Sequence, residues 1–381
     1  MHLAMVSETY PPEVNGVALT VASLRQQVQL EGHRVSLVRP RQATERTSGR
    51  DPATDELVLG SLPIPRYPEL RFGLPAGRRL LQHWSGQRPD AVYIATEGPL
   101  GWSALRAAQR LGIPVASGLH TRFDDYMRRY GFSWLAPLAL GWMRHFHNRA
   151  KATLVPTAEL RRFLNNRGFE RVQELGRAVD CQLFDPARRD PNLRREWSAD
   201  SDHPVLIHVG RLAAEKNLPL LVASVRAVQK QRPNARCVLV GDGPERAALQ
   251  LAHPDFLFAG VQRGEALARH FASADLFLFP SHSETFGNVT LEAMASGVAT
   301  VAFDYGAAKA YIESGGHGIT VAQHDEDGFI EQAVRLAGDG ELRRQLASSA
   351  RSRIAQSDPR SLARQFIQMM TNLPRQQEAL A

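Results

Sequence analysis

The chain has 381 residues, of which 43% are hydrophobic and 22% charged, a composition that excludes a disordered or fibrous chain and predicts a compact soluble protein. That length corresponds to about two domains. The net charge of +7 lies in the first half, because residues 1–190 hold 26 Lys and Arg against 18 Asp and Glu, whereas residues 191–381 hold 20 against 21. This asymmetry indicates an anionic partner for the first half, such as a membrane surface, nucleic acid or a phosphorylated substrate, or else compositional drift.

Short apolar segments alternate with longer amphipathic ones along the first half, as in strands that feed helices and return to a parallel sheet. The predicted strands are Leu3–Val6, Val35–Val38, Ala91–Ile94, Val115–Ser117, Thr153–Val155 and Val172–Leu175. Between Asp185 and Pro204 the sequence is polar, charged and Pro-containing, which predicts a linker.

The alternation resumes after the linker. The predicted strands are Val205–Val209, Cys237–Val240, Phe256–Ala259, Leu276–Phe279, Thr300–Phe303 and Ile319–Val321, and the chain from about Gly338 to Met370 is predicted to be helical throughout. The fold class is therefore α/β, with doubly wound domains at 1–185 and 204–355, a linker at 186–203, and a C-terminal helix at 356–381 that packs back on the first domain as a brace. Two such domains that face each other would bind a ligand in the cleft between them.

Cysteine usage and hydropathy bear on the compartment. Cys181 and Cys237 are the two cysteines of the chain, which favours a reducing environment. No apolar run reaches the ~18 residues of a spanning helix, and Met1–Gly16 lacks the features of a signal peptide. We therefore expect a cytoplasmic protein.

The polar turn after the predicted strand Leu276–Phe279 is the first candidate site. Glu284 lies in this turn, and Glu292 lies about two turns into a helix expected to begin near Phe286 or Gly287. The first backbone N–H groups of such a helix favour a phosphate, which makes candidate ligands of Gly287, Asn288 and Val289. Alternatively, Glu284 caps the helix and Glu292 lies on a solvated face.

Two other turns carry groups suited to a diphosphate. In the segment Gly210–Asn217, Arg211 offers a planar guanidinium and Lys216 a point charge, although Lys216 could instead pair with the adjacent Glu215 on the surface. Near the N-terminus, Asn15 and Gly16 stand at the expected start of a helix, where backbone amides can approach an anion. Asn-Gly also marks ordinary turns.

His120 follows the predicted strand Val115–Ser117 and could contact a sugar hydroxyl or a developing charge, although a lone histidine is often structural. The segment Gly241-Asp242-Gly243 lacks the third glycine of a dinucleotide fingerprint, so NAD is not expected. No Asp-x-Asp motif accompanies the diphosphate residues, so we expect no metal ion and no cofactor.

These segments, in this order, resemble glycosyltransferase family 4, whose members have the GT-B architecture of two facing Rossmann-like domains. The resemblance covers nearly the whole chain and is most specific in the E-x7-E pair Glu284 and Glu292 together with the upstream segment Gly210–Asn217. It implies a retaining enzyme that transfers a sugar from a nucleotide diphosphate donor without a metal.

The resemblance also implies roles for individual residues. Arg211 and Lys216 would hold the donor diphosphate and take up charge as it leaves, while Glu284 would contact the transferred sugar. Glu292 would bind the ribose, and His120 would lie against the sugar at the reaction centre. Gly16 would approach the phosphates. In the front-face mechanism proposed for such enzymes, a donor phosphate oxygen helps to deprotonate the acceptor.

Within the family, His120-Thr121-Arg122-Phe123 and the segment Trp142–Ala150 are similar to a bacterial glycolipid branch. This branch includes GDP-mannose-dependent α-mannosyltransferases, diacylglycerol glycosyltransferases and sulfoquinovosyl transferases. Ala178 departs from the pattern, since these enzymes usually have Gly before Val-Asp. The donor base and sugar stay open between GDP-mannose and a UDP-hexose.

The segment from Arg128 to Arg149 carries an apolar run, Trp134 to Met143, between basic residues. Such a segment suits the headgroup region of an anionic membrane, which would place the enzyme at the inner face of the cell membrane with a lipid-linked acceptor. The alternative is a helix packed on the first sheet, with a core of Leu135, Leu138, Trp142 and Phe146.

Other functions share parts of this pattern. An enzyme of the same fold could act on a soluble or polysaccharide acceptor, or epimerise a sugar nucleotide. A catalytically silent sensor would keep the nucleotide-sugar site only. Nucleic acid is not expected as a partner, because no recognised module interleaves aromatic and basic residues.

Overall fold

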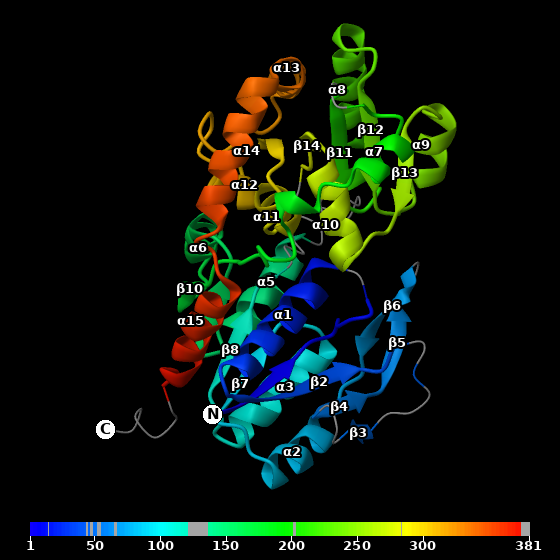
Figure 1. Cartoon of the computed structure of the whole chain (residues 1–381). Coiled ribbons are helices and arrows are strands. Elements are labelled where there is room, and N and C mark those ends of the chain that lie inside the picture. Colours follow the sequence, from blue (N-terminus) through cyan, green and yellow to red (C-terminus); the bar gives the residue numbers. More distant parts are fainter. Residues whose placement is uncertain are drawn as a thin grey trace. The chain divides into compact units, whose positions relative to one another are not determined.

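The computed structural model describes residues 1–13, 15–42, 45, 49–51, 55–64, 67–120, 136–200, 203–282 and 284–374. The chain forms two compact units: unit 1 is Met1–Gly176 with Pro359–Ala381, and unit 2 is Arg177–Asp358. Each unit contains its own sheet of mainly parallel strands, with helices on both faces (Figure 1). The chain thus leaves unit 1 at Gly176, earlier than the predicted boundary at 185.

Unit 1 contains an eight-stranded sheet in the order β10-β9-β8-β7-β1-β2-β4-β3, in which only β3 is antiparallel among the described pairs. The strands are β1 (His2–Val6), β2 (Arg34–Pro40), β3 (Gly49–Asp51), β4 (Glu56–Leu59), β7 (Ala91–Ile94), β8 (Val115–Gly118), β9 (Ala152–Val155) and β10 (Val172–Glu174), and a separate hairpin pairs β5 (Ser61–Ile64) with β6 (Tyr67–Gly73). The helices are α1 (Gly16–Leu30), α2 (Gly77–Gly86), α3 (Pro99–Arg110), α5 (Ala136–His147), α6 (Ala158–Asn165) and α15 (Pro359–Thr371).

Alternating side chains of the unit 1 strands point to opposite faces of the sheet. Leu3 and Met5 pack with α1 and α15, whereas Ala4 and Val6 pack with α2 and α3. Helices α1 and α15 lie side by side although they are far apart in the sequence (Figure 1). The chain runs from β1 to β2 on one side and later returns to β7 on the other, so the order of strands reverses between β1 and β7.

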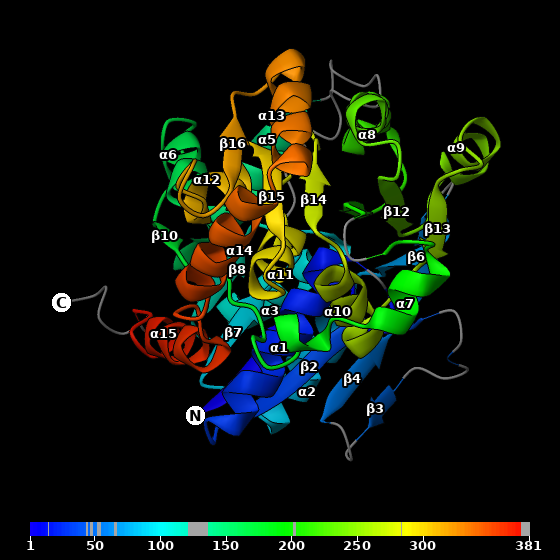
Figure 2. The same ribbon diagram turned by 45° about the horizontal axis from the view of Figure 1, so that its top comes forward.

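Unit 2 contains a parallel six-stranded sheet in the order β13-β12-β11-β14-β15-β16 (Figure 2). The strands are β11 (Val205–Val209), β12 (Arg236–Val240), β13 (Leu257–Gly260), β14 (Leu276–Phe279), β15 (Ala299–Phe303) and β16 (Ile319–Val321). The helices are η2 (Pro186–Arg188), α7 (Pro191–Glu196), η3 (Ala214–Lys216), α8 (Leu218–Gln231), α9 (Arg246–Ala252), α10 (Gly264–Ser273), α11 (Asn288–Ala295), α12 (Gly306–Tyr311), α13 (Glu326–Gly338) and α14 (Gly340–Ile354). Here the order of strands reverses between β11 and β14.

The predicted linker at 186–203 is wrong over its described residues, because this stretch folds as part of unit 2. Asp190 caps α7 through its side chain, and Leu193 and Trp197 are buried in the same cluster as the strands of unit 2. Arg194 is also buried and donates hydrogen bonds to Asp275 and to backbone carbonyls. Charged side chains that make the segment look solvated are therefore used for tertiary contacts.

The continuous C-terminal helix predicted from Gly338 to Met370 is also wrong. The chain forms α14 and α15, with a break before Pro359, which lies at the start of the second helix. A proline cannot continue a preceding helix because it lacks the backbone N–H and disfavours the helical conformation of the residue before it. The break allows α14 to belong to unit 2 and α15 to belong to unit 1.

The anchoring of α15 in unit 1 gives a test of stability. Phe366 is fully buried, and its ring contacts that of Tyr93 on β7 edge-on, with centroids 5.0 Å apart. We expect Phe366→Ala to lower the free energy of unfolding by ~3–5 kcal/mol, through lost apolar burial and the cavity left behind. Gln365→Ala, on the exposed side of the same helix, is the control. Chemical denaturation checks this, and equal stability of the two variants would contradict the packing role of α15.

Candidate functional site

An ion pair stands at the point where the strand order of unit 2 reverses. Lys216 follows β11 and donates from Nζ to Oε1 of Glu284, which follows β14. The hydroxyl of Ser281 donates to the same Oε1 at 2.9 Å. Both charged side chains are largely buried, at 14% and 16% exposure. Open α/β sheets bind ligands at this position, outside the carboxyl ends of the strands.

The backbone of the loop after β11 lies very close to that of the loop after β12. A Cβ atom on Gly241, after β12, would overlap the carbonyl oxygen of Gly210, and one on Gly243 would overlap that of Leu212. Asn217 then adopts the left-handed conformation, with φ 50°, between η3 and α8. The two glycines that resemble a dinucleotide fingerprint therefore serve the close approach of two loops, which positions Arg211 and Lys216.

Arg211 and Lys216 have separate acidic partners. Arg211 lies 3.2 Å from Glu215, measured from Nε to Oε1, and is 35% exposed. The alternative that Lys216 pairs with Glu215 is wrong, because Lys216 reaches Glu284 and also lies 5.6 Å from the centre of the Phe279 ring. A guanidinium and an ammonium group at one sheet edge can bind a diphosphate.

His208 is a buried residue of this region that sequence reasoning missed. It lies on β11, and its Nδ1 is 3.0 Å from the backbone carbonyl of Leu278 on β14. Burial lowers the pKa of His208 to about 4, and the charge of Lys216 acts in the same direction. The imidazole is therefore neutral at physiological pH and adds no positive charge beneath Lys216. His208 could have been noticed in the sequence, because it is the one polar residue in the otherwise apolar strand Val205–Val209.

Helix α11 begins at Asn288, close to the predicted start. Gly287 precedes it in the left-handed conformation, with φ 93°, and the helix has no side-chain cap. The polarity of a helix N-terminus favours an anion near the backbone of Gly287, Asn288 and Val289. The alternative that Glu284 caps this helix is wrong, since its carboxylate pairs with Lys216 and Ser281.

Glu292, on α11, is not a residue of a solvated face. Its Oε2 is buried and has no hydrogen-bond partner among the described residues. Burial raises the pKa of Glu292 to about 7. A buried carboxyl oxygen without a partner is costly, so this group is suited to a ligand that supplies hydroxyl donors, as the predicted ribose contact would.

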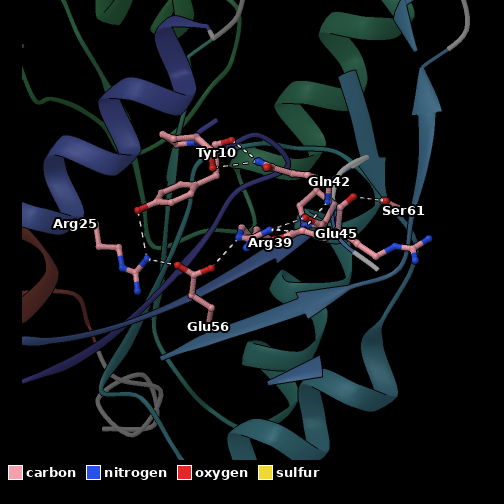
Figure 3. Close-up of polar contacts among 10 residues, drawn as sticks. Tyr10, Arg25, Arg39, Gln42, Glu45, Glu56 and Ser61 are labelled. Atoms are coloured by element: carbon pink, nitrogen blue, oxygen red, sulfur yellow. Dashed lines mark hydrogen bonds and ion pairs between the residues drawn. The ribbon is translucent and has the colours of Figure 1, made fainter. Parts of the chain in front are cut away.

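The first turn of unit 1 is held by a buried network of charges (Figure 3). Asn15 caps α1, accepting a hydrogen bond from the backbone of Ala18 at 2.9 Å, and Gly16 is the first residue of that helix. Gln42 donates to the carbonyl of Tyr10 at 2.6 Å, and Arg25 donates to Glu56 at 2.6 Å and to the Tyr10 hydroxyl at 3.3 Å.

Arg39 extends this network by joining Glu56 to Glu45, with distances of 2.8 Å and 2.6 Å. All four charged groups of the network have a partner of opposite charge, which offsets the cost of burying them. The side chain of Asn15 is used as a helix cap. Hydrogen bonds of Tyr10 connect the loop that precedes Asn15 to Gln42, after β2, and through Arg25 to Glu56 on β4.

His120 follows β8, as predicted, and its Nε2 lies 2.8 Å from the hydroxyl of Tyr93 on the adjacent strand β7. Gly118 permits this contact, because a Cβ atom there would overlap the Tyr93 hydroxyl and lie 2.6 Å from Nε2 of His120. Tyr93 thus orients the imidazole. The sequence gives no sign of this role, because Tyr93 lies in an apolar strand. The neighbouring residues Thr121, Arg122 and Phe123 lie outside the described residues.

The structure therefore gathers Arg211, Lys216, Glu284, the start of α11 and Glu292 within unit 2, and places Asn15, Gly16 and His120 in unit 1. Residues 14–183 match a model described as Glycosyltransferase Family 4, and residues 203–339 match one described as Glycosyl transferases group 1. A GDP-mannose-dependent alpha-mannosyltransferase of Mycolicibacterium smegmatis is 35% identical over 86% of this chain and 86% of its own. The chain belongs to glycosyltransferase family 4.

Other relatives of this glycosyltransferase include an Alpha-monoglucosyldiacylglycerol synthase of Streptococcus pneumoniae, 25% identical over 79% of this chain and 71% of that protein. Among solved structures, Anabaena HepE in complex with UDP covers 98% of this chain and 100% of its own, with a TM-score of 0.76 and 18% identity. That likeness supports the GT-B fold.

The unpartnered carboxyl of Glu292 predicts a pH-dependent stability. Folding raises the pKa of Glu292 from 4.5 to about 7. The protonated carboxyl therefore makes its full contribution to the stability of the substrate-free enzyme below pH 4.5, and this contribution is lost as the pH rises through 7, where the buried carboxyl must ionise. We expect Glu292→Gln to melt at a higher temperature than wild type at pH 8 and at a similar one at pH 4.5. Glu331→Gln, on the exposed face of α13, should change neither. A Glu292→Gln variant less stable than wild type at pH 8 would show that the carboxylate has a partner.

Proposed function

We propose that this glycosyltransferase moves a hexose from a nucleotide diphosphate sugar, GDP-mannose or a UDP-hexose, to a lipid-linked acceptor such as diacylglycerol or a glycolipid, with retention and an α linkage. The observation that carries the donor assignment is the pair Arg211 and Lys216 beside the N-terminus of α11, at the strand reversal of unit 2. Positive groups in this setting match a diphosphate better than any neutral ligand.

In this proposal the bond between the anomeric carbon and the diphosphate breaks while the acceptor hydroxyl attacks from the same face. Negative charge grows on the leaving diphosphate, and Arg211 and Lys216 stabilise it. Glu284, held by Lys216 and Ser281, contacts the transferred sugar, and His120, oriented by Tyr93, contacts it at the reaction centre. Gly16 approaches the phosphates, Glu292 binds the ribose, and a donor phosphate oxygen receives the acceptor proton.

The test of this function is to incubate the purified enzyme with GDP-mannose or UDP-glucose and total bacterial lipid, and to identify new glycolipids by mass spectrometry. The proposal expects a hexosylated lipid whose anomeric proton has α geometry by NMR. We expect transfer to survive EDTA, because Arg211 and Lys216 supply the charge that a metal ion would otherwise supply. Donor consumption in the absence of lipid, with free sugar as product, would instead indicate an epimerase or hydrolase.

The diphosphate residues give a kinetic prediction. Lys216→Ala and Arg211→Ala should each lower kcat/KM by ~10²-fold or more, as expected for loss of one preorganised group that stabilises developing charge. Lys230→Ala is the matched control, because Lys230 is an exposed lysine of the same unit. Circular dichroism melts would separate lost catalysis from lost folding. Near-normal turnover by both variants would exclude the diphosphate assignment.

The lipid acceptor is supported by a surface of unit 1 that we call the α3–α5 face. It consists of the half-buried Trp102 and the exposed residues Arg106, Leu138, Trp142 and Arg149. Leu138 is 67% exposed and Trp142 is 41% exposed. The rings of Trp102 and Trp142 lie 5.1 Å apart, and both arginines lie within 6 Å of the Trp102 ring. Neither α3 nor α5 contains an acidic residue.

The exposure of this face contradicts the alternative in which the helix packs its whole apolar face on the first sheet. Phe146 is buried as that alternative expects, but Leu138 and Trp142 are not, and Leu135 and the predicted start of the segment at Arg128 lie outside the described residues. Among the described residues no helix has the length and hydropathy to cross a bilayer. We propose that the α3–α5 face contacts an anionic membrane surface, with its aromatic side chains at the headgroup level and its arginines near lipid phosphates.

Cosedimentation with vesicles tests the α3–α5 face. Binding should require anionic phosphatidylglycerol, weaken at high salt, and fall by ~10-fold or more in Leu138→Glu, which adds a negative charge and removes apolar contact. Leu251→Glu places the same change at a more exposed leucine of unit 2 and should leave binding intact. Binding that does not depend on lipid charge or salt, or that is equal in Leu138→Glu and Leu251→Glu, would favour a soluble acceptor.

A further inference from the structure

Two carboxyl groups lie at the strand reversal of unit 1, and the roles described above use neither of them. Glu8 follows β1 and Glu97 follows β7, and these strands are parallel neighbours, with Val6 paired with Ile94. Open α/β sheets bind ligands beyond the carboxyl ends of their strands at such a reversal. In unit 2 the equivalent position holds Lys216 and Glu284. In unit 1 it holds two acids.

Glu8 is satisfied within the protein. Its side chain accepts hydrogen bonds from the backbone N–H groups of Leu100, at 2.9 Å, and Gly73. A Cβ atom on Gly98 would overlap the Glu8 carboxyl, so the chain leaves room for this side chain. Burial raises the pKa of Glu8, and the backbone N–H groups oppose that change. Glu8 therefore joins β1 to β6 and to the start of α3.

The Glu97 carboxyl is less completely satisfied, because its hydrogen bond within the protein is with the backbone N–H of Glu97 itself. The residue is 6% exposed, and its Oε1 is buried without a hydrogen-bond partner among the described residues. Its backbone is nevertheless fixed, because the carbonyl of Glu97 accepts a hydrogen bond from Nε1 of Trp142 at 3.2 Å. Burial raises the pKa of Glu97 to about 7, the backbone N–H of Glu97 opposes this change, and the negative charge of Glu8 adds to it.

The charge of Glu8 and the unpaired oxygen of Glu97 indicate which kind of ligand could bind at this position. The negative charge of Glu8 disfavours an anionic ligand such as a diphosphate at this position. A carboxyl oxygen with unused lone pairs accepts a hydrogen bond from a hydroxyl, and when the carboxyl is ionised this hydrogen bond is stronger than one between neutral groups. An unpaired buried carboxyl also lowers stability, a cost that a bound hydroxyl would remove.

We propose that Glu97 binds a hydroxyl group of a polyhydroxylated ligand, a sugar or glycerol unit, at the strand reversal of unit 1. The inference deepens the proposed function, on which it rests for the identity of that ligand. The hydroxyl belongs either to the acceptor or to the transferred hexose, since both have this chemistry.

Stability gives the first test and requires no substrate. Glu97→Met keeps the size of the side chain and removes the unpaired carboxyl, so its melting temperature should equal or exceed that of wild type by ~1–4 °C. Glu170→Met is the control, because Glu170 is 59% exposed on the surface of the same unit. A fall of several degrees in Glu97→Met alone would show that the carboxyl is satisfied in the protein and would overturn the proposal.

Binding gives the second test. Saturation-transfer NMR with glycerol and with methyl α-mannoside should show contact in wild type and in Glu97→Gln, whose amide oxygen still accepts a hydrogen bond, and at least a ~10-fold loss of affinity in Glu97→Met. Absence of binding to wild type, or equal binding to Glu97→Met, overturns the proposal whether or not the enzyme transfers sugar to lipid.

Kinetics of the transfer reaction identify the source of the hydroxyl. If it belongs to the acceptor, Glu97→Met raises KM for the lipid ~10-fold and leaves KM for the donor unchanged, and the reverse result assigns it to the donor sugar. Glu97→Gln should restore the affected KM to within ~3-fold of wild type. Unchanged values of both constants in Glu97→Met contradict the proposal, whereas failure of the proposed function appears as a wild-type enzyme that forms no glycolipid.

Discussion

The ion pair between Lys216 and Glu284 is the interaction on which the candidate site depends. Each residue follows a strand, β11 or β14, and these strands are neighbours only because the sheet of unit 2 reverses its order between them. The largely buried pair costs desolvation energy, which its own attraction and the hydroxyl of Ser281 offset. A pair of this kind orients a cation at the sheet edge while its carboxylate keeps a second oxygen for a ligand.

The surrounding backbone serves that orientation. Gly241 and Gly243 allow the loop after β12 to touch the loop that carries Arg211, and the left-handed Asn217 turns the chain into α8. His208 is neutral and so does not compete with Lys216 for its acidic partner. In the proposed function these features are in place before a donor binds, so little reorganisation would be needed when charge develops on the leaving group.

In the described part of each unit, a buried carboxyl group has one oxygen without a hydrogen-bond partner. Glu292 on α11 and Glu97 after β7 each have an oxygen that lacks a hydrogen-bond partner among the described residues, and burial raises the pKa of each to about 7. Groups of this kind reduce the stability of the free protein and increase its affinity for ligands that satisfy them. Glu292 and Glu97 differ in this respect from Glu8 and Asn15, whose side chains accept hydrogen bonds from the protein itself.

The amino-acid sequence was enough to predict the α/β class, the strands that carry the candidate site, and the position of the E-x7-E pair after β14, because apolar periodicity and helix-start residues are local properties of the chain. It did not reveal that the segment 186–203 packs into unit 2, since the charges of Arg194 and Asp190 look solvated until their partners in the fold are known. The fold was needed to show that Lys216 pairs with Glu284 rather than Glu215 and that Tyr93 orients His120. It was also needed to show that Glu97 and Glu292 each have a buried oxygen without a hydrogen-bond partner among the described residues. These facts depend on which strands become neighbours and on how much water remains beside a side chain, and neither quantity is encoded in the spacing of residues along the chain.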